Sequence, residues 1–514
     1  MAGSNYTTKS VPISSKAFNG GLNSTAGSLE LQDNESSDLQ NIDFDKFGSI
    51  LKRNGYYCTL GTDTTKSAVP YDGLHWFEYN DAGVPTRKAV RVFNGKIWKM
   101  DDLDGTWDDI TGYITITSGN HCDFENFLNN VYVTNGVDKP FMWARGTTAN
   151  EMAVPAGLTT SKYVRLFNNY LFLGNVAVGG TSMPSRIYWS NIKDTSTWDS
   201  DQFIEVAKDD GTEITGLKVL QDRLVVYKHK AIYNVFFTGD ADFPFILPGG
   251  GKSNSAVGCI APWSIQEVEN MHVFLAPDGI YCYDGSSSLK TSYKIQKTLD
   301  GLNQSRFTQA VSSVYKPKNR YQLALPSASA TQNDRVIVWD YFNNAFSQYV
   351  GMSPSSLCTF FVEGITEQPY FADYSGYVYR MDFGSTDYPL NTATAINAYY
   401  YTNWKTFDDL CDQKGIPNVY LYYATGNAVL TLAYSYDFES KDQYTQTISL
   451  AGGTDVYGTA VYGTGVYSAS GGAVVRRDLT GRGRVVRFKF ANAVIGEGFQ
   501  IDGFGSYAHL ETNV

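Results

Sequence analysis

A short phrase that recurs along the chain constrains its fold more than any other feature. Each copy is a turn with Gly or Asn followed by a strand of alternating β-branched and aromatic residues, as in 94–101 (NGKIWKMD) and 375–382 (SGYVYRMD). One strand residue from each copy gives the series Ile97, Phe141, Ile187, Ile232, Ile280, Val336 and Val378. The successive gaps are 44, 46, 45, 48, 56 and 42 residues. Four-stranded propeller blades repeat at roughly 40–50 residues.

A second strand precedes most copies at the spacing of a β-hairpin. Residues 222–227, for example, precede Ile232, and in several copies two to five turn residues separate the strands. The repeat therefore predicts an all-β fold with a six- or seven-bladed β-propeller over residues 51–390. The blade number stays open, because the first and last repeats can close one blade jointly. Helical periodicity is scarce, and only residues 292–304 are expected to form a short helix.

The composition agrees with this fold class. Aromatic residues make up 15% of the chain and there are 48 glycines, whereas charged residues make up 18%. Aromatic side chains suit a pleated, half-buried surface, and glycine suits the turns between strands. The net charge of −11 argues against a general nucleic-acid binder, because phosphate binding needs a basic surface.

The sequence changes in character beyond residue 390. Longer alternating strands, such as 398–404 and 430–436, replace the repeated phrase. Five or more such strands within residues 391–514 predict a separate C-terminal β-sandwich. The Gly-rich stretch 451–472 within this region is expected to be an exposed loop or a long hairpin tip.

The first 50 residues, 1–50, are rich in turn residues and have few apolar residues to bury, as in 33–41 (DNESSDLQN). This predicts an extended N-terminal arm that leads to a strand at 49–53. The chain begins without an apolar stretch typical of a secretory signal. No apolar run approaches the roughly 18 residues that a membrane helix needs, so we expect no membrane anchor.

The residues that could carry catalysis do not form a recognisable pattern. The five histidines are His75, His121, His229, His272 and His509. They are far apart in the sequence, and His272 is expected to be structural because it sits in an apolar strand. The six cysteines are scattered without a C-x-x-C pair, and neither a G-x-S-x-G elbow nor a P-loop is present. We therefore expect no enzyme activity, no cofactor and no metal site.

One group of basic residues departs from the acidic average. Its members are Arg476, Arg477, Arg482, Arg484, Arg487 and Lys489. Arg484 and Lys489 differ in face on an alternating strand, so the six cannot all form one flat patch. Three interpretations stay open: a hydrated edge that discourages strand-to-strand aggregation, contact with an acidic neighbouring subunit, and contact with DNA phosphates. The second makes these six residues candidates for a subunit contact.

Several segments resemble virion proteins of tailed bacteriophages. Residues 18–23 (FNGGLN) and 38–56 (DLQNIDFDKFGSILKRNGY) are similar to an F-x-G-G-L-N arm and a D-L-x-N…G-x-[IL]-x-[KR]-R-x-G-Y segment of that family. Residues 187–198 (IYWSNIKDTSTW) resemble a blade of the propeller tail-hub proteins of short-tailed phages, often called packaged-DNA stabilisation proteins. Further similar segments are 221–235, 481–490 and 499–504.

The resemblance implies a structural tail hub or nozzle. Such proteins form a homo-oligomeric ring, with a hexamer favoured, around the DNA exit channel, where they help to retain and then pass packaged DNA. The implied partners are tail adaptor and portal-proximal proteins, tail fibres or spikes, and DNA in passing contact. The implied location is the virion tail, after assembly in the bacterial host cytoplasm. An acidic channel wall would repel DNA and let it slide.

Two other functions stay open. A receptor-binding or fibre-attachment tail protein could use Tyr-rich strands to stack on sugars, although cores and subunit interfaces use Tyr equally. A glycan-degrading propeller enzyme is the second. Residues 193–198 and 103–108 resemble fragments of the S-x-D-x-G-x-T-W turns of sialidase propellers, but those turns are structural.

Overall fold

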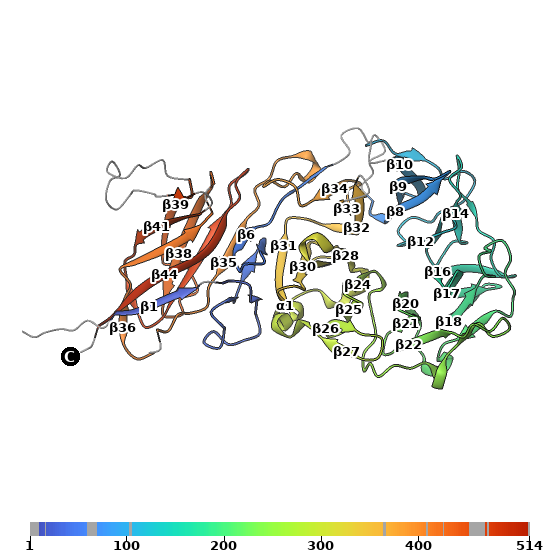
Figure 1. Ribbon diagram of the computed structural model, residues 1–514, viewed down its shortest axis with the longest axis horizontal. Coiled ribbons are helices and arrows are strands. Elements are labelled where there is room, and N and C mark those ends of the chain that lie inside the picture. The colour runs from blue at the N-terminus through green and yellow to red at the C-terminus, as the bar shows by residue number, and fades with distance from the viewer. Residues whose placement is uncertain are drawn as a thin grey trace, which may run out of the picture.

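The computed structural model describes residues 10–15, 17–58, 69–101, 105–362, 366–407, 410–424, 426–451, 468–469 and 472–511. They form two lobes side by side, a ring of small sheets and a pair of larger sheets (Figure 1). Strands dominate both lobes, and the one α-helix in these ranges is α1 (Gln296–Asp300). No helix in the described ranges has the length and apolar character needed to cross a bilayer.

The ring lobe is a β-propeller whose described strands make seven four-stranded antiparallel blades. The first strand of each blade lies nearest the ring axis (Figure 1). Blade one contains β8 (Tyr71–Asp81), β9 (Val84–Phe93), β10 (Lys96–Asp101) and β11 (Asp108–Asp109), and blade two contains β12 (Asp123–Phe127), β13 (Asn130–Thr134), β14 (Phe141–Trp143) and β15 (Asn150–Glu151). Blade three contains β16 (Leu158–Phe167), β17 (Tyr170–Val178), β18 (Thr181–Trp189) and β19 (Phe203–Glu205), and blade four contains β20 (Ile214–Leu220), β21 (Arg223–Lys228), β22 (Ile232–Phe237) and β23 (Phe245–Ile246). Blade five contains β24 (Gln266–Val268), β25 (Met271–Ala276), β26 (Gly279–Tyr283) and β27 (Ser288–Lys290), and blade six contains β28 (Val311–Tyr315), β29 (Arg320–Leu325), β30 (Arg335–Asp340) and β31 (Ala345–Val350). Blade seven contains β32 (Pro354–Val362), β33 (Thr366–Asp373), β34 (Val378–Met381) and β7 (Tyr56–Cys58).

The sequence repeat corresponds to one strand type. All seven residues of the series lie in the third strand of a blade, in β10, β14, β18, β22, β26, β30 and β34. Each is at most 2% exposed, because neighbouring blades cover both faces of the strand. The apolar, alternating character of this strand is therefore repeated in every blade, and the predicted β-propeller is confirmed.

The seventh blade takes its fourth strand from the chain that precedes the first blade. β7 pairs antiparallel with β34, with Tyr57 opposite Arg380. Tyr56 is 2% exposed and packs edge-on against Phe371 and Tyr379, at ring-centroid distances of 5.1 and 5.2 Å. The first and last repeats are therefore separate blades, and only β7 is borrowed across the closure. This decides the open blade number in favour of seven.

The 56-residue gap in the repeat contains an extra segment between blades five and six. The helical turns η4 (Ser292–Ile295), α1 and η5 (Gln304–Gln309) lie there. Leu299 and Phe307 fix the segment, at 1% and 2% exposure. The short helix expected at 292–304 is confirmed in part: residues 292–295 form a 3-10 turn, the α-helix covers only 296–300, and residues 301–303 are not helical.

The second lobe is two sheets packed face to face. The nine-stranded sheet contains β1 (Ser10–Ser15), β5 (Ile42–Phe44), β6 (Ile50–Lys52), β36 (Gln413–Gly415), β37 (Asn418–Tyr423), β40 (Ser468–Ala469), β41 (Gly472–Asp478), β42 (Arg482–Gly483) and β44 (Gln500–Glu511). The five-stranded sheet contains β4 (Leu39–Gln40), β35 (Ala398–Tyr401), β38 (Val429–Tyr436), β39 (Tyr444–Ser449) and β43 (Val486–Asn492). Phe488 and Phe504 meet between them, with ring centroids 5.3 Å apart. Most of the Gly-rich stretch 451–472 lies outside the described residues.

The N-terminal segment is integrated into this sandwich. β1 pairs with β44, β4 pairs with β35, and the β5–β6 hairpin joins β44. A short parallel pair, β2 (Gly21–Leu22) with β3 (Glu35–Ser36), lies between β1 and β4 in the sequence. The expectation of few apolar residues to bury is wrong for the described part, because Phe18, Leu22, Leu39 and Ile42 are all at most 2% exposed. These side chains are widely spaced in the sequence, but all four join one core.

The same segment joins the sandwich to blade six. Ser347 Oγ donates to the Ile42 carbonyl at 2.5 Å, and the Gln348 amide donates to the Leu39 carbonyl at 2.7 Å. One continuous apolar cluster contains Tyr321 of blade six, Phe18 and sandwich residues such as Phe490. The two lobes therefore share a core through the N-terminal segment.

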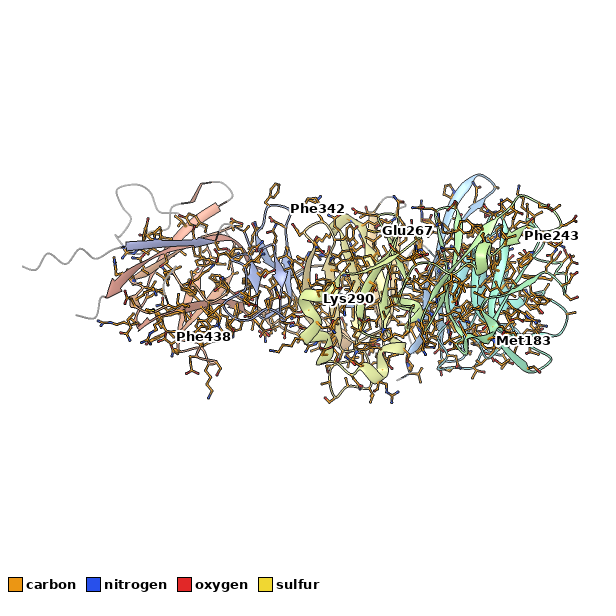
Figure 2. All side chains as sticks on the ribbon, turned by 90° about the horizontal axis from the view of Figure 1, so that it is seen from below. Met183, Phe243, Glu267, Lys290, Phe342 and Phe438 are labelled. Atoms are coloured by element: carbon orange, nitrogen blue, oxygen red, sulfur yellow. The ribbon has the colours of Figure 1, made fainter. Side chains whose placement is uncertain are left out.

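Large aromatic side chains are exposed on both broad sides of the molecule. Phe342 and Phe438, which are 59% and 48% exposed, lie on opposite sides in the edge-on view (Figure 2). Phe47 is 91% exposed, on a turn in which Asp45 Oδ1 accepts the backbone N–H groups of Phe47 and Ser49. Exposed aromatic side chains scattered singly over a surface are normal in folded proteins.

Candidate functional site

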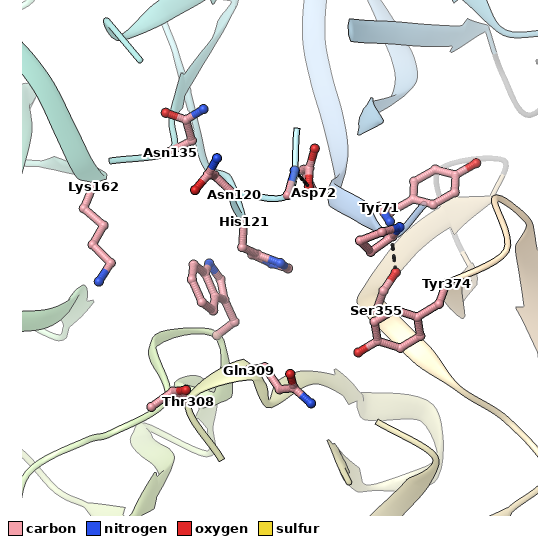
Figure 3. A pocket seen from close by; sticks show the side chains of 13 residues that line it. Tyr71, Asp72, Asn120, His121, Asn135, Lys162, Thr308, Gln309, Ser355 and Tyr374 are labelled. Carbon is pink, nitrogen blue, oxygen red and sulfur yellow. Dashed lines mark hydrogen bonds between the residues drawn. The ribbon is translucent and has the colours of Figure 1, made fainter. Parts of the chain in front are cut away.

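A pocket of about 340 Å³ lies on the propeller axis, where the inner strands begin. It is lined by Pro70, Tyr71, Asp72, Gly119, Asn120, His121, Asn135, Lys162, Trp263, Thr308, Gln309, Ser355 and Tyr374. Figure 3 shows His121 near the middle, with Lys162 on one side and Ser355 and Tyr374 on the other. Every inner strand begins near the axis, so residues from distant parts of the chain meet here.

Asp72 is the most buried charged group of this pocket. It is the second residue of β8 and only 2% exposed. Its Oδ1 accepts the Gly119 N–H at 2.9 Å, whereas its Oδ2 is buried without a hydrogen-bond partner among the described residues. Burial raises the pKa of Asp72 to about 7, and hydrogen bonds from the Gly119 N–H and the Ser118 side chain lower it to a smaller extent. The carboxyl group is therefore poised between its neutral and charged forms near neutral pH.

Two aromatic rings form the apolar part of the wall. The His121 and Trp263 rings contact each other, with centroids 4.1 Å apart and planes tilted by 51°. Burial lowers the pKa of His121 to about 4, so the imidazole is neutral at neutral pH. The Trp263 indole Nε1 is buried and has no hydrogen-bond partner in the described part of the chain.

Other polar wall residues are held by internal hydrogen bonds. Ser355 Oγ accepts the Tyr71 N–H at 3.2 Å, marked by a dashed line in Figure 3. The Tyr374 hydroxyl accepts the Asn333 N–H at 3.2 Å. The Lys162 Nζ lies 3.7 Å from Glu213 Oε1 and 5.7 Å from the centroid of the Tyr163 ring. Ser355 and Tyr374 are therefore fixed by hydrogen bonds within the protein.

A cluster of charges lies further along the same inner strands. Arg165 of β16 contacts Asp123 at 2.7 Å and Glu125 at 3.0 Å, which links the third blade to the second. Lys218 of β20 belongs to the same electrostatic group, and burial lowers its pKa to about 8. The His75 ring of β8 donates through Nε2 to Asn126 Oδ1 at 2.8 Å, and burial lowers the pKa of His75 to about 4. The pairing of opposite charges explains how these groups are accommodated near the axis.

A second hollow lies on the outer face of the nine-stranded sheet. Its volume is about 700 Å³, and its lining includes residues of β1, β37 and β44. Tyr422 lies opposite Gly503 and Tyr420 opposite Gly505 in the pairing of β37 with β44. Since glycine has no side chain, the two glycines form a trough beside the tyrosines. Tyr422 and Tyr507 are each 50% exposed, so this face is an aromatic surface open to solvent.

The six predicted basic residues are divided between the two sheets of the sandwich. Arg476 and Arg477 lie on β41 and Arg482 on β42, near opposite ends of the nine-stranded sheet. Arg484 follows β42, and its Nε donates to the Cys411 carbonyl at 3.2 Å. Arg487 and Lys489 lie on β43 of the other sheet. The structure therefore does not bring the six together.

Arg487 and Lys489 are engaged within their own sheet. The Arg487 guanidinium lies 4.4 Å from the centroid of the Tyr401 ring and 4.7 Å from that of Trp404. Lys489 pairs with Asp442 at 3.0 Å and lies 4.9 Å from the Tyr401 centroid. Cation–π contacts and an ion pair therefore hold these two cations on the surface of the sheet. Arg476, which pairs with Asp478 at 2.9 Å on an exposed strand, is better placed for an external partner.

The histidines have separate environments. His272 is 1% exposed, and its two ring nitrogens bond to the Tyr227 hydroxyl and the Val219 carbonyl, as expected of a structural histidine. Only His121 lines the axial pocket. Within the described ranges, no three His, Cys, Asp or Glu side chains are grouped to hold a metal ion.

Sequence reasoning missed the axial pocket. Asp72, His121 and Trp263 are separated by 49 and 142 residues, and no local motif connects them. One signal could have found them: each stands at or just before the first strand of a blade. The same position in every repeat unit faces the axis of a propeller.

No family model matches the chain, and no curated protein is significantly similar to it. Among solved structures, it is similar to YCF48 bound to a D1 peptide, with 10% identity, a TM-score of 0.39, and coverage of 67% of this chain and 99% of that chain. It is also similar to the computationally designed Ika8 protein, with 11% identity, a TM-score of 0.34, and coverage of 62% of this chain and 98% of that chain. For a chain of a mitotic checkpoint complex the identity is 8% and the TM-score 0.37, with coverage of 57% of this chain and 86% of that chain. With every TM-score below 0.5, these likenesses carry no argument about function.

Proposed function

We propose that this protein is a non-enzymatic structural component of a bacteriophage tail. In this proposal it forms a homo-oligomeric ring, with a hexamer favoured, around the DNA exit channel, and it helps to retain and then pass packaged DNA. Tail adaptor and portal-proximal proteins would bind one end of the ring, and fibres or spikes would bind its periphery. Its location would be the virion tail, after assembly in the host cytoplasm.

The observation that carries the proposal is the way in which the N-terminal segment fastens the two lobes. Arg53 is 2% exposed, donates to both carboxylate oxygens of Asp387 at 2.8 and 2.6 Å, and donates to the Val350 carbonyl at 3.1 Å. Asp43 of the sandwich pairs with Arg320 of blade six at 2.9 Å. These buried ion pairs tie the propeller and the sandwich together within one subunit, which is the kind of rigid building block that the proposed ring would need. The resemblance of residues 18–23 and 38–56 to phage tail proteins falls on this same segment.

Assembly of the purified full-length chain tests the proposal. We expect sedimentation velocity and negative-stain images to show closed rings, or a ring that forms when the tail adaptor is added. A chain that stays monomeric at high concentration and does not bind the adaptor would contradict it. A salt titration separates two interpretations of Arg476: assembly that weakens with salt supports a contact with an acidic neighbour, and insensitive assembly supports a hydrated edge.

A second candidate function is attachment to a receptor or a fibre. The trough beside Tyr420, Tyr422 and Tyr507 favours it, because exposed tyrosines supply large, rigid contact area. This function is tested by the adsorption to host cells of reconstituted particles that carry Tyr422→Ala or Tyr507→Ala. The control is Tyr113→Ala, at an exposed loop position away from this face. Equal adsorption by all three variants would argue against this function.

A further inference from the structure

A buried lysine and a buried asparagine contact each other between the two sheets of the sandwich. Lys52 is the last residue of β6, in the nine-stranded sheet, and Asn492 is the last residue of β43, in the five-stranded sheet. The two residues are 5% and 2% exposed. The Lys52 Nζ donates to Asn492 Oδ1 at 2.6 Å and to the Val494 carbonyl at 3.2 Å. Each sheet therefore contributes one functional group, an amine or an amide, to the same contact.

The side-chain amide of Asn492 is held in one orientation. Its Nδ2 donates to the Val429 carbonyl and to Glu497 Oε2, both at 2.8 Å. Its Oδ1 accepts the backbone N–H of Val494 at 3.3 Å. The reversed amide would turn its own N–H groups toward two donors, the Lys52 Nζ and the Val494 N–H. The amide therefore presents its carbonyl group to the lysine and its nitrogen to the carboxylate.

The amine of Lys52 is close to the carbon of this amide. A carbonyl bond is about 1.2 Å long, so an Nζ at 2.6 Å from Oδ1 can be no more than about 3.8 Å from Cγ. This upper limit is already near the separation of about 3–3.5 Å at which two bound groups react. Burial lowers the pKa of Lys52 to about 8, so part of the amine is neutral and nucleophilic near neutral pH.

The other contacts of Asn492 suit the breaking of its amide. An amide nitrogen leaves readily only when it receives a proton as its bond breaks. Glu497 Oε2 contacts this nitrogen and is itself fixed by the Val429 N–H at 2.8 Å, so the carboxyl group is placed to carry that proton. The Val494 N–H points at Oδ1, where it can stabilise the negative charge that develops there during the attack.

We propose that Lys52 and Asn492 form an intramolecular isopeptide bond, with Glu497 as the catalytic residue that moves the proton. The neutral Nζ attacks Cγ of Asn492, the Nζ–Cγ bond forms, and the Cγ–Nδ2 bond breaks. Glu497 carries one proton from Nζ to Nδ2, which leaves as ammonia, and the carboxyl group ends as it began. The reaction consumes no oxidant or reductant. Each chain reacts once, so this self-modification goes beyond the structural role proposed above and does not depend on it.

The bond would close a very large covalent loop. Lys52 and Asn492 are 440 positions apart, and every strand of the propeller lies between them. Closing such a loop removes conformations from the unfolded chain, which favours the folded state. The two sheets of the sandwich would also stay linked when both lobes unfold.

Mass spectrometry of the purified full-length protein tests the proposal. We expect an intact mass that is lower by one molecule of ammonia than that of the unmodified chain. Trypsin should release residues 47–53 joined to residues 490–514, because it does not cleave after a modified Lys52. The linked peptide is decisive, since an asparagine that cyclises on its own backbone loses the same mass without joining two peptides. An unreduced mass with the two peptides separate would overturn the proposal.

Two substitutions test the roles of the residues. Lys52→Met keeps a long stem but removes the nucleophile, and Glu497→Gln keeps the shape but removes the proton carrier. We expect no linked peptide in Lys52→Met, and bond formation at least about a hundredfold slower in Glu497→Gln, the scale of a lost acid–base catalyst. The linked fraction at matched times after synthesis measures the rate, and circular dichroism shows whether each variant folds. A folded Glu497→Gln variant that links as fast as wild type would overturn the role of Glu497.

Lys228 provides a matched control in the same digest. Its side chain is fully buried, and its Nζ contacts the Ser185 hydroxyl, the Asp210 carboxylate and two backbone carbonyls. Because this amine faces no side-chain amide in these contacts, the peptide that contains Lys228 should be found unlinked. Linkage of Lys228 to the same extent as Lys52 would show that cross-linking is unspecific and would overturn the assignment. Ring assembly, measured separately by sedimentation, reports on the proposed structural function independently.

Discussion

At the scale of single residues, burial decides which charged groups need a partner to be stable in their charged form. Asp72 and Arg53 are both 2% exposed, but they are stabilised differently. Arg53 has a bidentate carboxylate partner in Asp387, whereas one oxygen of Asp72 has none. An unpaired buried carboxylate is costly, so Asp72 retains its proton to a higher pH. The stability of the protein therefore depends on pH through this residue.

The ionisation of Asp72 predicts a loss of stability between about pH 4 and pH 7. Its pKa is raised by burial from 3.8 to about 7, so the folded protein keeps the proton in this range while the unfolded chain releases it. Asp72→Asn removes this difference. The difference in unfolding free energy between the Asp72→Asn variant and wild type should therefore grow in favour of the variant from pH 4.5 to pH 8. The expected size is about 1.4 kcal/mol per unit of pKa shift. Urea denaturation at both pH values measures it, and a difference independent of pH would contradict the assignment.

At the scale of elements, ring closure depends on a three-residue strand. β7 is separated from its partner β34 by more than 300 residues of chain, yet it supplies the fourth strand of blade seven. Tyr56 fixes it through two edge-on aromatic contacts and a hydroxyl that donates to the Gly351 carbonyl at 2.7 Å. Such a strand cannot be stable by itself, so its side chains must hold it in place.

Truncation of Tyr56 is therefore expected to open the closure. Tyr56→Ala should cost about 3–5 kcal/mol of unfolding free energy, as for other buried aromatic residues. Hydrogen exchange should show earlier loss of protection in β34 than in the third strands of other blades. Tyr113→Ala, at a fully exposed position, serves as the control and should change neither quantity. Unchanged protection of β34 in the Tyr56 variant would show that β7 is not needed for closure.

At the scale of the whole molecule, the N-terminal segment makes one body of two lobes. It pairs with strands of both sandwich sheets, contacts blade six and then closes blade seven. The Arg53–Asp387 pair lies where the propeller, the sandwich and this segment meet. Cooperativity between the lobes should therefore depend on the pair.

Loss of this pair should uncouple the two lobes. We expect wild type to unfold in one calorimetric transition, and Arg53→Met to lose about 3–5 kcal/mol because Asp387 remains buried and unpaired. The variant should also show two transitions in place of one. The control is Arg87→Met, whose partner Glu78 is half exposed, and it should cost at most about 1 kcal/mol. Two transitions in wild type would refute the coupling.

The sequence alone determined the features that repeat locally. Alternation of apolar residues reports strands, and the spacing of Ile97 to Val378 reports one buried strand per blade, because every blade buries its third strand in the same way. Tertiary structure alone decided which distant segments meet: β7 with β34, Phe18 with Tyr400, and Asp72 with His121 around one pocket. It also dispersed the basic residues 476–489 over two sheets. Periodicity reflects neighbours along the chain, whereas these contacts depend on ring closure and on the packing of the two lobes.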